Sequence, residues 1–225
     1  LDRPIHAFTC AYDEGPAFDE RPYVRAVVEA SGATSHVVVP DGRDFWTVFD
    51  RIGTMHAEPT AGPGVYSQWK VMDLAHRAGL RVLLDGQGGD EILAGYFRYL
   101  PLRLRDLVAS GDLAGFLRDL DGVADRLGLA HTLALAFEPW LPSLLVGSLR
   151  RAYGQGKDKV LGEGLKDLES ARPPRAPRGW GTAVRAQQAF DATQRLLPSL
   201  LRYEDRSSMA FSVEGRSPFA APAVQ

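Results

Sequence analysis

The sequence predicts an α/β protein whose parallel sheet has helices on both faces, followed by a mainly helical region. Short segments rich in β-branched residues alternate with amphipathic helical segments through residues 1–100, which is typical of a parallel sheet. Beyond about residue 100 this alternation stops, and Leu, Ala and Arg recur at helical spacing. A glycine-rich turn follows the third strand segment, at the edge where open parallel sheets bind ligands.

The strands and helices expected in the first hundred residues follow from the residues within and beside them. Strands are expected over residues 5–11, 37–39 and 82–84, helices over 19–32, 44–52 and 65–79, and a loop over 61–64. Pro22 suits the first turn of its helix because its missing N–H would have no helical partner there. Gly32 ends that helix, and Pro40 ends the second strand.

The remaining chain is expected to be helical over residues 102–152 and again over 182–212, with a Pro- and Gly-rich connection over 154–181. We therefore divide the chain into three parts. Residues 1–100 form the α/β part, residues 101–181 form a helical insertion with its connection, and residues 182–225 form a second helical part.

The turn after the third strand carries the chemistry. Asp85 ends the apolar run, glycines follow, and then come Asp90, Glu91 and a new apolar pattern. Glycines let backbone N–H groups approach an anion such as phosphate. Carboxylates beside a phosphate need a divalent cation between them, and Mg²⁺ is the usual choice. A structural interpretation stays open, in which Asp90 caps the helix and Glu91 favours its dipole.

Two common phosphate motifs are excluded. The dinucleotide motif G-x-G-x-x-G requires glycine where Glu91 stands, and the chain contains no Gly-Lys-Ser/Thr.

The composition of the chain excludes several further classes of protein. The 225 residues carry a formal net charge of −2, so there is no electrostatic case for binding nucleic acid or an anionic membrane. No apolar run approaches the ~20 residues of a membrane span. Cys10 is the single cysteine, which excludes internal disulfides. The five histidines show no metal-ligand spacing, so we expect structural roles for them.

Four segments in order resemble the asparagine synthetase family. Residues 85–96 are similar to its S/D-G-x-G-x-D-E-x-x-x-G-Y segment, and residues 202–219 are similar to its R-x-x-D-R-x-S-M-A-x-x-x-E-x-R-x-P-F pattern. Asp19-Glu20 and Glu58-Pro59 each precede a helix, in the expected order. Residues 102–180 match no motif.

The resemblance implies the synthetase domain of a glutamine-hydrolysing asparagine synthase, with the adenine-nucleotide α-hydrolase-like fold and a cytoplasmic location. ATP would activate the side-chain carboxylate of aspartate as an acyl-adenylate, and ammonia derived from glutamine would displace AMP. ATP and Mg²⁺ are thus the expected cofactors, and residues 1–100 the nucleotide-binding part.

The resemblance also assigns residues. Asp90 is the expected Mg²⁺ ligand, and Asp90 and Glu91 are the expected catalytic residues, although Glu91 is better suited to supporting the loop. The residues expected to contact the nucleotide are Cys10, Asp85, Gly86, Gln87, Gly88 and Gly89. Cys10 would do so from the first strand, through main-chain groups rather than its thiol.

Gln87 departs from the family, because many asparagine synthetases have glutamate there. Glutamine cannot act as a base, so either another residue deprotonates the incoming amine or the acceptor differs. Two alternatives stay open: another ATP-dependent amide-forming enzyme of this fold, such as a lasso-peptide or β-lactam cyclase, and a non-catalytic relative that binds only nucleotide or a partner.

The downstream motif mixes charges of both signs, and its charged members are Arg202, Glu204, Asp205, Arg206, Glu214 and Arg216. Such runs are usually a solvated helix face. The resemblance favours a partly buried ion network that braces the synthetase site. Met209 and Phe211 are expected in the core.

Several parts of the family are absent from the sequence: the S-G-G-x-D-S loop, the N-terminal glutaminase domain and a lysine beyond the P-F motif. The sequence also begins with Leu1. We therefore expect an internal fragment that has no synthetase activity by itself.

Overall fold

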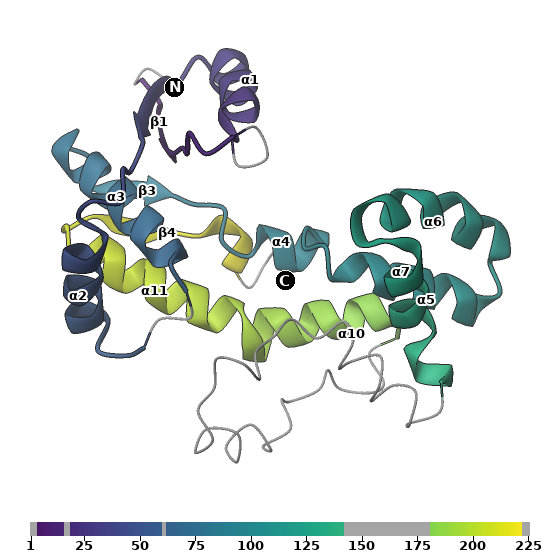
Figure 1. Cartoon of the computed structure of the whole chain (residues 1–225). Coiled ribbons are helices and arrows are strands. Elements are labelled where there is room, and N and C mark those ends of the chain that lie inside the picture. Colours follow the sequence, from purple (N-terminus) through teal and green to yellow (C-terminus); the bar gives the residue numbers. More distant parts are fainter. Residues whose placement is uncertain (1–3, 16–18, 60–61, 142–180, 222–225) are drawn as a thin grey trace. The chain divides into compact units, whose positions relative to one another are not determined.

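The computed structural model describes residues 4–15, 19–59, 62–141 and 181–221. The chain forms two compact units (Figure 1). Unit 1 comprises residues 1–87 and 198–225, and unit 2 comprises residues 88–197.

Unit 1 contains parallel strands, as the sequence predicted. β1 (His6–Cys10) pairs with β2 (Thr34–Val38), and β3 (Val82–Leu84) pairs with β4 (Glu214–Arg216). Within the described residues these are two separate two-stranded sheets rather than one continuous sheet. The second strand begins and ends earlier than predicted, and β4 was not predicted at all. A Glu-Gly-Arg segment has no β-branched residue, so only its pairing with β3 makes it a strand.

The helices of unit 1 are α1 (Arg21–Ser31), α2 (Phe45–His56), α3 (Gly64–Arg77) and most of α11 (Leu197–Met209). α2, α3 and α11 share a core that includes Ile52, Trp69 and Tyr203. Phe211 packs on this core, with its ring centroid 4.8 Å from that of Trp69, as predicted. The prediction for Met209 is wrong, because its side chain is 59% exposed.

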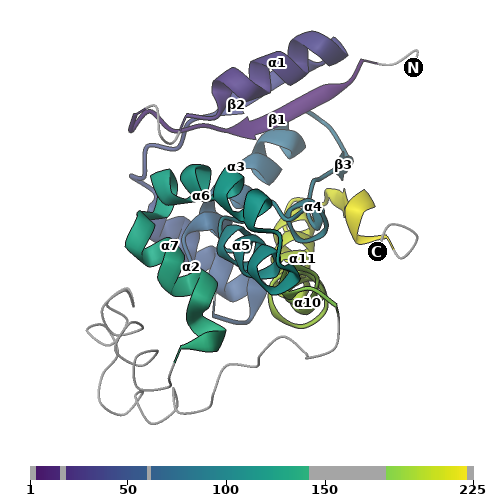
Figure 2. The ribbon, with the colours of Figure 1, turned by 90° about the vertical axis from the view of Figure 1, so that its right-hand side faces the viewer.

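Unit 2 is helical. It consists of α4 (Gly89–Leu93), α5 (Tyr99–Ser110), α6 (Leu113–Leu127), α7 (Leu129–Phe137), the short helix η1 (Glu138–Trp140), α10 (Ala183–Phe190) and the π-type turn η3 (Asp191–Arg195). Figure 2 shows α5, α6 and α7 together, and Leu104, Phe116 and Ala136 fill the core between them. The helical prediction for this region is confirmed where the structure describes it. The predictions for residues 142–180 lie outside the described residues.

Polar contacts join the first and last helices of unit 2. The Asp106 carboxylate on α5 accepts hydrogen bonds from the backbone N–H groups of Ala183 (2.6 Å) and Val184 (3.0 Å) at the start of α10. None of the helices formed by the described residues is both long enough and apolar enough to cross a membrane.

Candidate active site

The residue that ends β3 is held at three points. The Asp85 N–H donates to the Arg216 carbonyl (3.0 Å), which continues the pairing of β3 with β4. Asp85 Oδ1 accepts from the backbone N–H of Gln87 (2.8 Å), and Oδ2 accepts from the Ser217 hydroxyl (2.9 Å). Asp85 is half-buried, so its carboxylate has a fixed position with access to solvent.

A second carboxyl group lies beside Asp85, and it belongs to Glu204, which the sequence placed only among the charged members of the downstream motif. Glu204 of α11 is only 4% exposed and lies beside Asp85 and Gln87, although no hydrogen bond of ordinary geometry reaches its side-chain oxygens within the described residues. Burial, and then the neighbouring Asp85 carboxyl, raise the pKa of Glu204 to about 9, and Gln87 opposes this rise. Glu204 is therefore a neutral acid at neutral pH.

Helical spacing could have located Glu204. It shares a face of α11 with Leu197, Leu201 and Ser208, at positions i−7, i−3 and i+4. Leu197 and Ser208 are fully buried, and a carboxyl group on such a face has no water around it. Gly215 of β4 leaves room for it, since a Cβ there would lie 3.3 Å from Glu204 Oε1.

Glycine stands at positions 86 and 88 for different structural reasons. Gly88 has a φ of 94°, a left-handed conformation that favours glycine. Gly86 has no such conformation, and a Cβ added to it would have no atom within 4 Å. Neither backbone strain nor packing among the described residues therefore explains glycine at position 86.

Asp90 lies in the first turn of α4, and its side chain is exposed. Its carboxylate forms no hydrogen bond or ion pair within the part of the chain that the structure describes. The capping interpretation is wrong, because Gly88 occupies the cap position and no side chain caps the helix. The Asp90 carboxylate occupies the space beside Gly95, where the Cβ of any larger residue would overlap Asp90 Oδ1.

Glu91 points away from solvent and is 1% exposed. Its Oε1 accepts a hydrogen bond from the Tyr96 hydroxyl (2.9 Å), and burial followed by this contact raises the pKa of Tyr96. The Gln188 amide of α10 donates to the carbonyls of Glu91 (3.0 Å) and Ile92 (2.7 Å). These contacts fix α4 within unit 2.

Cys10 ends β1 beside two hydroxyl groups, those of Tyr12 and Ser67, which hydrogen-bond to each other. Burial raises the pKa of the Cys10 thiol, although both hydroxyls oppose the rise. The thiol is therefore uncharged at neutral pH, which does not favour nucleophilic chemistry.

The charged motif near the end of the chain divides between surface and interior. Arg202 and Arg206 of α11 both reach Glu58 Oε1, at 3.4 and 3.6 Å. Glu214 and Arg216 form an exposed pair at 2.9 Å. The solvated-face interpretation fits Glu214 and Arg216, whereas Glu204 is interior.

His56 lies buried near the Glu58 contacts. Its Nε2 is 3.0 Å from the Ser207 hydroxyl, and its ring stacks on Tyr203. Burial, and then Arg206, lower the pKa of His56, and Glu58 opposes the change. This histidine packs α2 against α11, which is a structural role.

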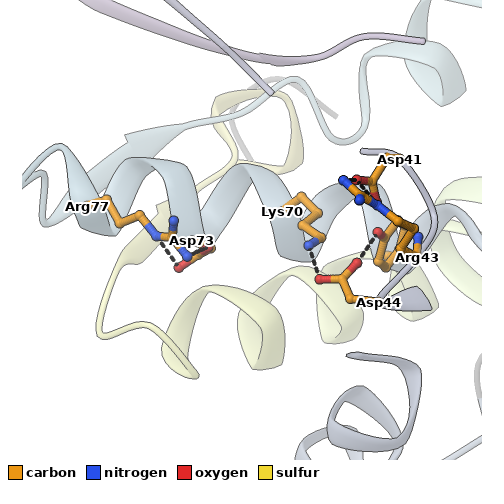
Figure 3. A network of polar contacts seen from close by, with 7 residues as sticks. Asp41, Arg43, Asp44, Lys70, Asp73 and Arg77 are labelled. Carbon is orange, nitrogen blue, oxygen red and sulfur yellow. Dashed lines mark hydrogen bonds and ion pairs between the residues drawn. The ribbon is translucent and has the colours of Figure 1, made fainter. Parts of the chain in front are cut away.

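A second polar cluster follows β2, and Figure 3 shows it. Asp44 pairs with Lys70 and accepts a 2.6 Å hydrogen bond from Tyr66, while Asp41 pairs with Arg43. A cavity of about 340 Å³ is lined in part by Asp41, Arg43, Asp44 and Lys70. Each carboxylate there has its own cation, in contrast to Asp85 and Glu204.

Comparison with known proteins explains the two motifs. The chain matches the sequence profile of the family described as asparagine synthase over residues 1–224. This chain belongs to the asparagine synthase family. Members of the family are ATP-dependent synthetases acting on small molecules, so the chain is part of a ligase family.

A relative of the family in Methanocaldococcus jannaschii is named "Putative asparagine synthetase (glutamine-hydrolyzing) 2". It is 30% identical over 142 residues, which cover 59% of this chain and 27% of that protein. The chain thus spans about a quarter of the length of this curated relative. No solved structure matches the chain significantly.

Proposed function

We propose that this chain is part of an asparagine synthase (glutamine-hydrolysing). In this proposal ATP activates the side-chain carboxylate of aspartate, and ammonia derived from glutamine forms the amide of asparagine. Residues 1–100 would be the nucleotide-binding part of an adenine-nucleotide α-hydrolase-like fold, followed by the helical insertion 101–181 and the motif-bearing part 182–225. The setting would be the cytoplasm.

The observation that carries the proposal is the open glycine at the carboxyl end of β3. Gly86 has nothing in front of it that would exclude a side chain, yet it follows a carboxylate fixed at three points. A ligand that must approach the backbone closely explains glycine there. The nucleotide contacts would come from Cys10, Gly88 and Gly89 together with residues 85–87.

Mg²⁺ fits the residues that are present. No group of three or more His, Cys, Asp or Glu in the described part of the chain could enclose a metal by itself. Mg²⁺ with nucleotides is usually held by one or two carboxylates plus phosphate oxygens, and Asp90 is an exposed carboxylate with no partner among the described residues. When bound, the metal would neutralise phosphate charge as pyrophosphate leaves.

The other residues of the loop have supporting roles in this proposal. Glu91 would brace α4 through Tyr96, and Gln188 would hold the carbonyl groups of α4 from α10. Fixing these groups before the reaction matters because adenylation depends mainly on positioning and charge neutralisation.

The test is aspartate-dependent exchange of labelled pyrophosphate into ATP, measured in the protein expressed from its complete reading frame. We expect exchange with Mg²⁺, formation of asparagine on adding ammonium, and a loss of more than about tenfold in Asp90→Asn, as for other groups that support a metal site. Gly122→Ala is the matched control for loop variants, since its Cβ would meet nothing within 4 Å on α6.

The alternatives give different results in the same assay. Exchange that depends on another carboxylate would indicate a different amide-forming ligase, such as a peptide or β-lactam cyclase. ATP binding without any exchange would indicate a non-catalytic relative. The absence of ATP binding would refute the proposal.

A further inference from the structure

Arg98 of unit 2 has hydrogen-bond donors that the fold leaves unused. It directly precedes α5, and its side chain is 32% exposed. A guanidinium group carries five N–H donors. Within the described residues none of them makes a hydrogen bond, although Nε is buried. A buried donor without an acceptor costs free energy, so its retention in the fold calls for a physical reason.

The guanidinium group of Arg98 is nevertheless held on two sides. Its Nε lies 3.3 Å from Oδ2 of Asp191, a fully buried carboxylate at the start of η3. Its central carbon lies 4.5 Å from the ring centroid of Tyr96 and 5.7 Å from that of Tyr99. Cations within about 6 Å of an aromatic ring centroid are attracted to its face. The two Nη groups therefore form the free edge of a fixed fork.

Asp191 has its own hydrogen-bond donors and needs none from Arg98. Its Oδ2 accepts from the Tyr99 hydroxyl (2.9 Å), and its Oδ1 accepts from the Gln187 amide (3.0 Å). Arg98 supplies the positive charge that a buried carboxylate requires. Arginine–carboxylate pairs are frequently bidentate, whereas this one consists of a single contact to Nε. Pairing with Asp191 alone therefore does not explain the free Nη edge.

The backbone that carries Asp191 is a second, independent observation. Residues Asp191–Arg195 form a π-type turn directly after α10. Such turns are rare in helices and are frequent at functional sites. Here the turn begins with the residue that holds Arg98, which indicates that the position of the guanidinium group serves a function.

We propose that the Nη edge of Arg98 binds an oxyanion of a ligase substrate, either a phosphate of the nucleotide or a carboxylate of the amino acid. This inference deepens the proposed function and rests on it. The planar fork of arginine matches the paired oxygens of both groups. Asp90, the proposed Mg²⁺ ligand, lies against Gly95 in the same segment of unit 2. This segment then carries both a metal ligand and an anion-binding group.

The charge on Asp191 determines how Arg98 would recognise its ligand. Because the buried carboxylate offsets the charge of the guanidinium group, the pair has little net attraction for anions in general. Recognition then depends on two N–H groups meeting two oxygens. Chloride carries the charge of an oxyanion without paired oxygens, so it separates charge attraction from bidentate recognition.

The test uses the protein expressed from its complete reading frame, with ¹⁵N-labelled arginine. NMR would follow the Arg98 Nε–H signal, which is assigned with Arg98→Lys. We expect ATP with Mg²⁺, or aspartate, to move this signal, and sodium chloride at the same ionic strength to leave it in place. A response to ATP identifies a phosphate as the ligand, and a response to aspartate identifies a carboxylate.

Binding constants from calorimetry give the second readout. Arg98→Lys keeps a positive charge beside Asp191 but lacks the fork, so it should bind the identified ligand about tenfold more weakly or worse. Its affinity for the other ligand should stay unchanged, which a merely structural role would not produce. Arg25→Lys, at an exposed arginine of α1, is the matched control.

Three results would overturn the inference: an Arg98 signal that neither ATP nor aspartate moves, an equal response to chloride, or wild-type affinities for both ligands in Arg98→Lys. If pyrophosphate exchange persists in any of these cases, the proposed function stands without the Arg98 site. A selective Arg98 response in a protein without exchange would contradict the proposed function and leave the oxyanion site standing.

Discussion

Replacing Glu204 by Gln should make the protein more stable at neutral pH, although it removes a residue of the candidate site. The unfolded chain ionises Glu204 near its ordinary pKa of 4.5, whereas the folded state raises that pKa to about 9. The stability that this group contributes is therefore fully present below about pH 4.5 and is lost as the pH rises towards 9. Glutamine imitates the neutral acid at every pH.

The size of the effect follows from linkage. Each pH unit between the two pKa values changes the folding free energy by about 1.4 kcal/mol, which gives on the order of 3 kcal/mol at pH 7. Sharing of the proton with Asp85 and partial solvation reduce this, so we expect about half, or ~2 kcal/mol. The gain should shrink towards zero near pH 4.5.

Urea unfolding of the wild type and of Glu204→Gln at about pH 5, 7 and 8.5 measures this difference directly. The other titrating groups contribute equally to the unfolding free energies of the two proteins, so their effects cancel in the difference. Glu29→Gln is the control for a substitution at an exposed site. A stability difference that does not change with pH would refute the reasoning, because Glu204 would then have the same charge in both states. Destabilisation by glutamine at every pH would also refute it.

Three further predictions concern other parts of the chain. Gly95→Ala should displace the Asp90 carboxylate, so the enhancement of ATP binding by Mg²⁺, measured by calorimetry, should fall while the melting temperature changes little. Leu104→Ala should destabilise unit 2 by about 2–5 kcal/mol in urea unfolding, because the side chain is fully buried in its core. The exposed Leu113→Ala should change stability by less than about 0.5 kcal/mol, and equal effects would contradict the packing. His56→Gln should differ most from wild type above about pH 6.5 and less on acidification, because a lowered pKa gives stability that is lost as pH falls.

The part of the site formed by contiguous residues could be predicted from sequence. Residues 82–84 are valine and leucine, which favour a strand, and the glycines that follow favour a turn. A new apolar pattern begins after Asp90 and favours a helix. Each of these elements therefore follows from neighbouring residues in the sequence. The structure places β3 and α4 where this pattern put them.

The rest depends on contacts between distant residues. β4 exists because β3 pairs with it, and a Glu-Gly-Arg segment carries no strand signal. Glu204 is separated from Asp85 by more than a hundred residues, so their proximity appears only in the fold. Charge in the sequence suggested a surface or an ion network for Glu204, whereas its helical face determined burial.

In the proposed reaction the protein joins a carboxylate to AMP before it forms an amide. The most direct measurement uses aspartate carrying ¹⁸O in its side-chain carboxylate, together with ATP, Mg²⁺ and ammonium, in the protein expressed from its complete reading frame. We expect one labelled oxygen to appear in AMP as asparagine forms. Product AMP without label, or label in inorganic phosphate with formation of ADP, would contradict it.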